Sequence, residues 1–231
     1  MENLYNVSTS SHVRDNSSTR GIMLDVIIAM LPASVFGIYQ FGISALIILV
    51  GTVFACVAAE YLFQRGMKKE QTIGDLSAVV TGMILALNMP PEIPVWIPML
   101  GGVFAIIVVK QLYGGIGFNW MNPALAARCF LLISFAGKMT NFTSKRLGFD
   151  AITGATPLAA LRAARATGNT MTTIKESYSF ADLFIGHIPG TIGEVSVIAL
   201  LIGVAYLLIR RVINLRTPIA YILTVTVFVF V

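Results

Sequence analysis

The sequence predicts an all-helical integral membrane protein with about seven hydrophobic crossings, including broken helices. Three observations predict this class. Of the 231 residues, 56% are hydrophobic and only 12% are charged, against about 45–50% and about 25% in soluble domains. The mean hydropathy is +0.82. Several apolar runs also approach the roughly 20 residues with which an α-helix crosses a bilayer. A water-soluble globule is therefore excluded.

The first half of the chain divides into a polar tail and a series of apolar runs. Residues 1–20 lack the basic start, apolar centre and cleavage site of a signal peptide. The runs that follow are 21–38, 43–63, 76–87 with an irregular continuation over 88–91, 95–113 and 122–135. Asp25 and Pro32 place an acid and a kink in the first run. The run 76–87 is too short to cross about 30 Å of hydrocarbon, which predicts a broken helix. The glycines between 114 and 117 predict a turn or unwound backbone.

The second half contains the only sizeable hydrophilic region, residues 137–191, which is rich in Thr, Ser, Gly and charged residues. Apolar runs return at 192–209 and 217–231. The last run stops after fifteen residues without a cap or flanking charge, so we expect the chain to be cut off within a helix. The membrane helices thus form a first set within 21–136 and a second within 192–231.

The distribution of positive charge predicts the orientation in an inner or plasma membrane. Lys and Arg in short loops are retained on the cytoplasmic side, and loops 64–75 and 210–216 carry the strongest clusters. If both loops are cytoplasmic, the N-terminal tail is cytoplasmic and region 137–191 is external. That region also holds basic residues, but only Lys138 lies close to a helix end, and long loops follow the rule poorly.

One motif in the hydrophilic region is more specific than any other part of the chain. It is the run Asp150-Ala151-Ile152-Thr153-Gly154-Ala155-Thr156. Thr156 is followed by Pro157 and an alanine-rich stretch, which is typical of a helix N-cap with proline at the first helical position. Backbone N–H groups and the positive end of the helix dipole can hold a phosphate group there. A capped surface helix without a ligand explains the same pattern, and this alternative stays open.

A second motif occupies residues 110–124, where a glycine cluster is followed by Asn119 and Asn122. Non-helical backbone at membrane depth is tolerated only where it is buried in protein or lines a cavity. Such breaks mark binding sites in transport proteins. A simpler interpretation is also open, in which Asn122 caps the next helix and Asn119 ties the loop.

Together the two motifs resemble the family of flavinylated membrane subunits that includes the RnfD subunit of the Rnf electron-transport complex. A more distant resemblance is to the NqrB subunit of the sodium-pumping NADH:quinone oxidoreductase. The resemblance runs from about Thr19 to the C-terminus. It implies that a flavin transferase joins FMN through its phosphate to Thr156. The other motif residues are Asp150, Thr153, Gly154 and Ala155. It also implies a non-covalent riboflavin, with Asn119 and Asn122 as candidate contacts.

The function implied by the resemblance is that of an FMN-carrying membrane subunit of an ion-translocating ferredoxin:NAD oxidoreductase. Such a subunit is not catalytic alone and passes electrons through covalent FMN, coupled to sodium or proton transport. The implied partners are a membrane iron–sulfur pair, a second flavinylated subunit, ferredoxin- and NAD-handling subunits, the flavin transferase and the lipid bilayer. The implied fold is an inverted repeat like that of urea and ammonium channels, with the first repeat and part of the second present. Two alternatives stay open: the quinone-linked NqrB subunit, and half of a solute transporter or channel without flavin.

The remaining polar and sulfur-containing residues predict little further chemistry. Asp25 is a candidate for an ion path, although it can also pair with a neighbour. Glu60 lies close to Arg65 and is expected to be an ordinary interfacial acid. Cys56 and Cys129 are expected to be small buried hydrophobic residues. The two histidines have no partner at metal-ligand spacing, and no basic patch suggests nucleic acid, so neither a metal site nor a nucleic-acid partner is expected.

Overall fold

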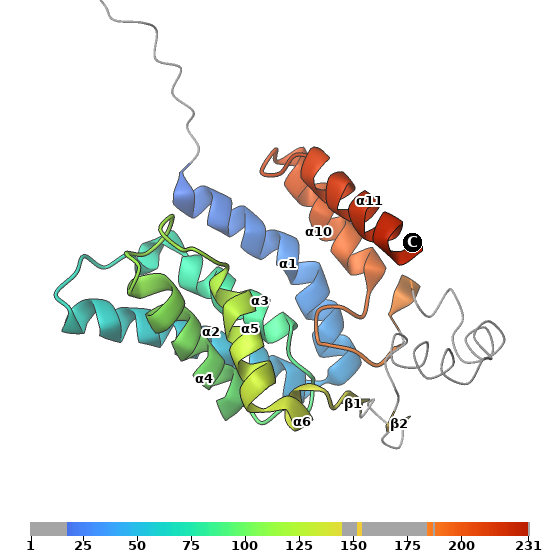
Figure 1. Cartoon of the computed structure of the whole chain (residues 1–231), viewed down its shortest axis with the longest axis horizontal. Coiled ribbons are helices and arrows are strands. Elements are labelled where there is room, and N and C mark those ends of the chain that lie inside the picture. The colour runs from blue at the N-terminus through green and yellow to red at the C-terminus, as the bar shows by residue number, and fades with distance from the viewer. Residues whose placement is uncertain (1–17, 145–151, 154–183, 187, 231) are drawn as a thin grey trace, which may run out of the picture.

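The chain folds as a bundle of helices, seen whole in Figure 1. This computed structural model describes residues 18–144, 152–153, 184–186 and 188–230. The helices are α1 (Thr19–Phe41), α2 (Ile43–Gly66), the short 3-10 helix η1 (Ile73–Asp75), α3 (Ser77–Leu87), α4 (Trp96–Phe104), the π-helix η2 (Ala105–Gln111), α5 (Pro123–Ser134), α6 (Ala136–Met139), α10 (Val197–Ile209) and α11 (Arg216–Phe230). Two strands of two residues each, β1 (Thr143–Ser144) and β2 (Ile152–Thr153), pair antiparallel. The predicted all-helical class is confirmed.

Helices α1 and α2 form a hairpin around Gly42 and confirm the first two apolar runs. Ser18 caps α1 by accepting a hydrogen bond from the amide of Gly21 (3.1 Å). Helix α1 continues through Pro32. By length and composition, α1 (23 residues) and α2 (24 residues) are able to cross a membrane. Within the described residues the other apolar helices are shorter, so the number of crossings stays a prediction.

Helix α3 is too short to cross the hydrocarbon of a membrane, which confirms the predicted broken helix. Its 11 residues rise only about 16 Å, roughly half the hydrocarbon thickness. The side-chain amide of Asn88 donates to the carbonyl oxygen of Ile84 (2.8 Å) and caps the helix end. The segment 88–95 then continues without helical structure although half of its residues are buried. Ser44 supports it from α2 by donating to the carbonyl oxygen of Pro91 (2.5 Å).

The predicted turn after the next run is also confirmed. Helix α4 continues into the π-helix η2, which ends at Gln111. Gly114, Gly115 and Gly117 follow with positive φ angles of 112°, 98° and 88°, a conformation that side chains with a Cβ rarely adopt. Asn122 then caps α5.

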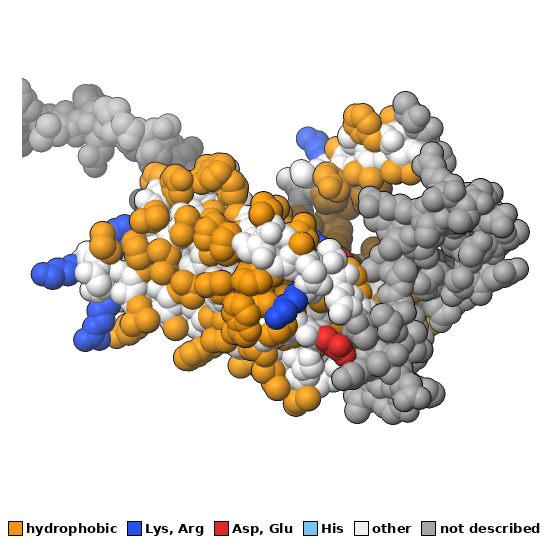
Figure 2. All heavy atoms as spheres, turned by 60° about the horizontal axis from the view of Figure 1, so that its bottom comes forward, with side chains coloured by type: hydrophobic (Ala, Val, Ile, Leu, Met, Phe, Trp, Pro, Cys, Tyr) orange, Lys and Arg blue, Asp and Glu red, His pale blue; other side chains and the backbone are white. Residues whose placement is uncertain are grey.

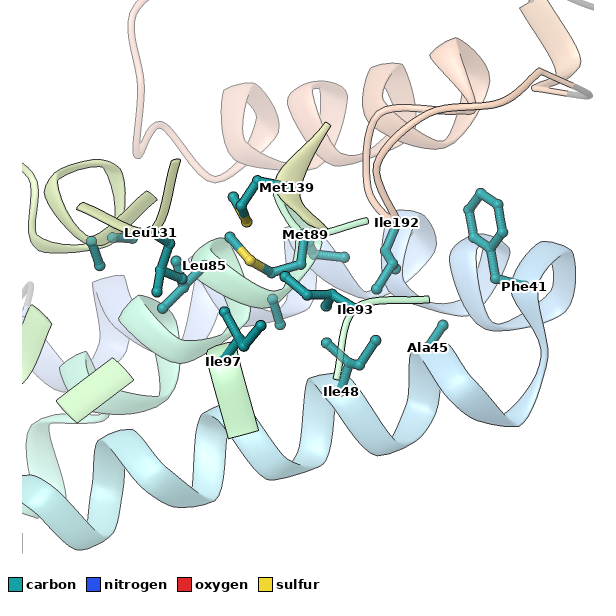
Figure 3. Packing of buried hydrophobic residues seen from close by; sticks show 14 of the residues in the cluster. Phe41, Ala45, Ile48, Leu85, Met89, Ile93, Ile97, Leu131, Met139 and Ile192 are labelled. Atoms are coloured by element: carbon teal, nitrogen blue, oxygen red, sulfur yellow. The ribbon is translucent and has the colours of Figure 1, made fainter. Parts of the chain in front are cut away.

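The apolar run predicted over 192–209 is helical only from Val197 onward, so its predicted start is wrong. The helix α10 begins only at Val197, because the preceding residues bond to the broken end of α3. The amide of Ile192 donates to the carbonyl oxygen of Met89 (3.1 Å), and that of Gly193 donates to Leu87 (2.8 Å). The two non-helical segments 88–95 and 188–196 therefore meet inside the bundle. Figure 3 shows Ile192 beside Met89 and Ile93 there.

Helix α1 lies between two groups of helices, with α10 and α11 on one side and α2 to α5 on the other (Figure 1). Gly203 of α10 packs directly on α1, where a Cβ would collide with the carbonyl oxygen of Ala29. Hydrophobic side chains cover much of the described part of the face shown in Figure 2, and Lys and Arg side chains gather mainly at the end where α2 terminates. An apolar surface of this kind suits contact with lipid.

The contacts place the two basic loops at the same end of the bundle. Lys69, after α2, donates to the carbonyl oxygen of Gln111 (3.5 Å), and η1 contacts α1. Arg210, after α10, pairs with Asp25 in the first part of α1 (3.1 Å). Met139 and Ile192 belong instead to the hydrophobic cluster around Met89, beyond the end of α3. The two flanks of the hydrophilic region thus lie away from both basic loops.

Candidate functional site

Most of the first motif falls on residues whose structure is not described. Asp150, Gly154, Ala155 and Thr156 lie outside the described residues. Thr153 is in β2, where its backbone pairs with Thr143 of β1. The attachment of FMN to Thr156 therefore stays a prediction.

The second motif lines a cavity of about 510 Å³ between η2, the glycine turn and α5. Its wall includes three aromatic side chains, those of Phe104, Tyr113 and Trp120. Tyr113 and Trp120 face each other across the turn with ring centroids 6.2 Å apart. Cys129 also lines the cavity and is exposed, so the prediction that both cysteines are buried is correct only for Cys56. The turn at 114–117 carries the chain back toward α5, and Tyr113 and Trp120 on either side of it line the cavity.

The two asparagines of the motif have different roles. The side-chain oxygen of Asn122 accepts hydrogen bonds from the amides of Ala124 (3.0 Å) and Leu125 (3.3 Å), which confirms the predicted cap. Asn122 also lines the cavity. The side-chain oxygen of Asn119 is buried and has no hydrogen-bond partner within the described residues. Asn119 thus offers a free acceptor beside Trp120.

A buried charged cluster, which the sequence interpretation missed, joins α2 to η2. The Nζ atom of Lys110 lies 2.7 Å from Oε1 of Glu60, and these side chains are 2% and 0% exposed. Gln111 donates to the same oxygen (2.7 Å), as do Thr72 (3.1 Å) and Gln64 (3.2 Å). The prediction that Glu60 is an ordinary interfacial acid is therefore wrong.

This cluster extends to α3 and leaves one oxygen unused. Lys110 also donates to Ser77 Oγ, which in turn donates to Asp75 (2.6 Å). The other carboxylate oxygen of Glu60 is buried without a partner among the described residues. Arg65 instead donates to Tyr61 (2.7 Å). A lysine inside the apolar run 95–113 is itself the signal for a buried acid partner, since isolated charges at membrane depth are costly.

Asp25 is the centre of a second polar contact, between α1 and α10. Its Oδ1 atom accepts from Tyr206 (2.9 Å) and from Nε of Arg210 (3.1 Å). Asp25 therefore pairs with neighbouring side chains, as the alternative interpretation predicted. Its assignment to an ion path stays a prediction.

A third polar contact ties α5 to both non-helical segments. Arg128 donates to the side-chain oxygen of Asn88 (2.8 Å) and lies 3.6 Å from a carboxylate oxygen of Glu194. Arg128 thus bridges the end of α3 and the segment before α10. None of these three residues was singled out from the sequence, because the pairing joins parts of the chain far apart.

Comparison with known proteins decides the family. The model of the NQR2, RnfD, RnfE family matches residues 6–231. The chain belongs to this family. One relative is the D subunit of the Na⁺-translocating ferredoxin:NAD⁺ oxidoreductase complex of Acetobacterium woodii, 47% identical over 224 residues, which are 96% of this chain and 68% of that protein. Another is the D subunit of the proton-translocating complex of Clostridium ljungdahlii, 36% identical over 97% of this chain and 68% of that protein.

A third member, from Halorhodospira halophila, bears the name of D subunit of an ion-translocating oxidoreductase complex. It is 35% identical over 94% of this chain and 67% of its own length. The chain thus spans about two thirds of the length of these NQR2, RnfD, RnfE family members. The resemblance stated from the motifs is confirmed, and family membership together with the two spanning-length helices supports the membrane class.

Proposed function

We propose that this chain is the FMN-carrying membrane subunit of an ion-translocating ferredoxin:NAD oxidoreductase complex of the Rnf type. The observation that carries the proposal is the family match over residues 6–231, which includes the motif ending at Thr156. Relatives at 47% and 36% identity bear the name of the D subunit of such complexes. Because these names are those of ferredoxin:NAD⁺ complexes, they favour this function over that of the quinone-linked NqrB subunit.

The roles that we propose for this chain and for the other subunits follow from the side chains that this sequence contains. An iron–sulfur cluster is held by four thiolates, and this sequence has two cysteines, Cys56 and Cys129. Other subunits would therefore supply the iron–sulfur centres and the sites for ferredoxin and NAD. The Thr156 hydroxyl would supply the ester oxygen to the FMN phosphate, which leaves the isoalloxazine ring free to transfer electrons. A flavin transferase would form that bond.

We assign the riboflavin implied by the resemblance to the cavity at the second motif. The wall of this 510 Å³ cavity contains aromatic side chains that can stack on a flat ring, and Asn122 lines it. Asn119 is not part of this wall, but it directly precedes Trp120, and its buried side-chain oxygen has no donor among the described residues. The apolar and aromatic wall fits the flat ring system of riboflavin. Binding of riboflavin to the purified chain, weakened by Asn119→Leu, is the expected result.

The proposed orientation places both basic loops in the cytoplasm and region 137–191, with FMN, outside. Its support is the positive-inside rule and the position of the two loops at one end of the bundle. We expect single cysteines at positions 68 and 214 to react with an impermeant label only from the cytoplasmic side, and one at position 138 only from outside. The exposed Cys129 is first replaced by alanine. Labelling of positions 68 and 138 from the same side would contradict this orientation.

Flavin fluorescence in denaturing gels tests the proposed function. After co-expression with a flavin transferase of the complex, the wild-type chain is expected to give a yellow-green band under ultraviolet light. Only a covalent flavin survives denaturation, so the band distinguishes this function from half of a solute transporter. A chain that is inserted in the membrane but shows no band would favour the transporter alternative.

A further inference from the structure

The buried cluster around Glu60 holds the end of η2, the helix that forms one wall of the cavity at the second motif. Lys110 and Gln111 are the last two residues of η2. Both donate to Oε1 of Glu60, each at 2.7 Å. Val109 directly precedes this pair, Tyr113 lies two residues after it, and both line the cavity. The two residues that Glu60 binds therefore lie between two residues of the cavity wall.

The glycine turn is bonded to the same two residues. The amide of Gly115 donates to the carbonyl oxygen of Lys110 (3.0 Å), and the amide of Gly114 donates to that of Gln111 (3.3 Å). A contact that fixes Lys110 and Gln111 on α2 thus also fixes the start of the turn. The turn then leads to the next residues that line the cavity, from Trp120 onward.

Apolar packing holds the start of η2 but not its end. Ile106, near the start, is 0% exposed and packs with Cys56 of α2. Gln111 is the last buried residue before the turn. Leu112 and Tyr113, which follow it, are 62% and 52% exposed, so burial contributes little to holding them. The position of the turn relative to α2 therefore depends on the polar contacts of the cluster.

Stability alone does not account for this cluster. A buried ion pair is often no more stabilising than well-packed apolar side chains of similar volume. Its bonds are directional, however, and hold the partners in one geometry. Gln64 and Thr72, which lie on α2 and in the loop after it, also donate to Glu60 Oε1. The additional donors from η2 fix a distant segment in place.

We propose that Glu60 is a positioning residue for the cavity at the second motif. Its bonds to Lys110 and Gln111 set the position of the η2 wall and of the glycine turn opposite α5. Glu60 is not among the residues that line the cavity, so it acts on a ligand only through these two residues. The inference rests on the proposed function, because it takes riboflavin as the ligand for which the wall is positioned.

Two variants remove these contacts, and a third is the control. Glu60→Leu combined with Lys110→Met, the double variant, removes the ion pair without leaving one buried charge behind. Gln111→Leu is milder, because it keeps the ion pair and removes one donor. Ile48→Ala is the control for a general loss of stability. Ile48 is also 0% exposed on α2, but it packs in the hydrophobic cluster around Met89.

Distances from pulsed EPR test the positioning without any ligand. Spin labels are attached to Leu112→Cys, directly after η2, and to Ile133→Cys, an 83% exposed position on α5. The exposed Cys129 is first replaced by alanine. The wild type and the control are expected to give the same narrow distance distribution. The double variant should give a shifted or broadened one, and Gln111→Leu a smaller change in the same direction.

Riboflavin titration of the unlabelled full chain in detergent tests the consequence for binding. The double variant is expected to bind riboflavin about tenfold more weakly than the wild type, and Gln111→Leu about threefold. The control should keep wild-type affinity although its melting temperature is lower. Glu60→Gln combined with Lys110→Met keeps an acceptor for Gln111 and should recover part of the affinity.

The two measurements separate this inference from the proposed function. A wild-type distance distribution in the double variant and in Gln111→Leu would overturn the positioning role. An altered distribution with unchanged riboflavin affinity would overturn it too, as would an equal loss of affinity in the control. A wild-type chain that binds no riboflavin would instead contradict the assignment of riboflavin to the cavity, and the distances would still decide whether Glu60 positions the wall.

Discussion

Thr156→Val is expected to abolish covalent flavin completely while the chain still inserts in the membrane. Valine has nearly the shape of threonine but lacks the hydroxyl oxygen to which the FMN phosphate would be joined. The matched control is Thr167→Val, which removes a nearby hydroxyl outside the motif. Thr167→Val should retain the fluorescent band in a denaturing gel.

Fluorescence of Thr156→Val after denaturation would contradict the assignment of FMN to Thr156. In that case a different hydroxyl carries the flavin, and peptide sequencing of the fluorescent fragment would locate it. Equal amounts of inserted wild-type and variant chain, measured by immunoblot, separate loss of attachment from loss of protein.

Lys110→Met is expected to lower the free energy of unfolding by about 3–5 kcal/mol, the cost of breaking a buried ion pair from one side. The variant leaves the Glu60 carboxylate, which is 0% exposed, without the ammonium group 2.7 Å away. Lys69→Met is the control, because Lys69 is exposed; within the described residues its Nζ atom makes one long bond to a carbonyl oxygen (3.5 Å) and lies 5.5 Å from the centroid of the Phe63 ring. Its effect should be within about 0.5 kcal/mol.

The second substitution Glu60→Gln tests whether the loss comes from the charge. Glutamine keeps an acceptor for Gln111 and Thr72 but carries no charge to compensate, so Lys110→Met with Glu60→Gln should recover most of the stability. Unfolding in a denaturing detergent titration measures all variants. A single variant Lys110→Met as stable as Lys69→Met would mean that the pair is not buried in the folded protein.

Much of the fold could be predicted because its signals are local. The length and apolar character of 43–63 define α2, and the Asn122-Pro123 pair defines the start of α5. The shortness of the run ending at Leu87 is enough to predict the break in α3. Each of these features depends on neighbouring residues only.

The errors concern contacts between distant segments. The residues before Val197 continue the apolar run in the sequence, but the amides of Ile192 and Gly193 bond to Met89 and Leu87. Glu60 is close in sequence to Arg65, yet its partner Lys110 is 50 residues away. Composition cannot distinguish such pairings, because they depend on how the helices pack.

In the candidate site, too, the local motifs could be predicted from the sequence and the contacts between distant segments could not. The run ending at Thr156 and the two asparagines can be recognised as motifs in the sequence. The cavity beside Asn122 cannot be predicted in this way, because it depends on the π-helix η2 and the glycine turn returning the chain onto α5. The free oxygen of Asn119 likewise follows from burial and not from residue type.

Mass spectrometry of the proteolytic peptide that contains Thr156 tests the central claim most directly. The chain is co-expressed with a flavin transferase, purified from membranes and digested. Covalent attachment predicts that this peptide is heavier than its sequence by one FMN less one water, with fragment ions that place the added mass on Thr156. An unmodified peptide from a chain exposed to an active transferase would contradict it.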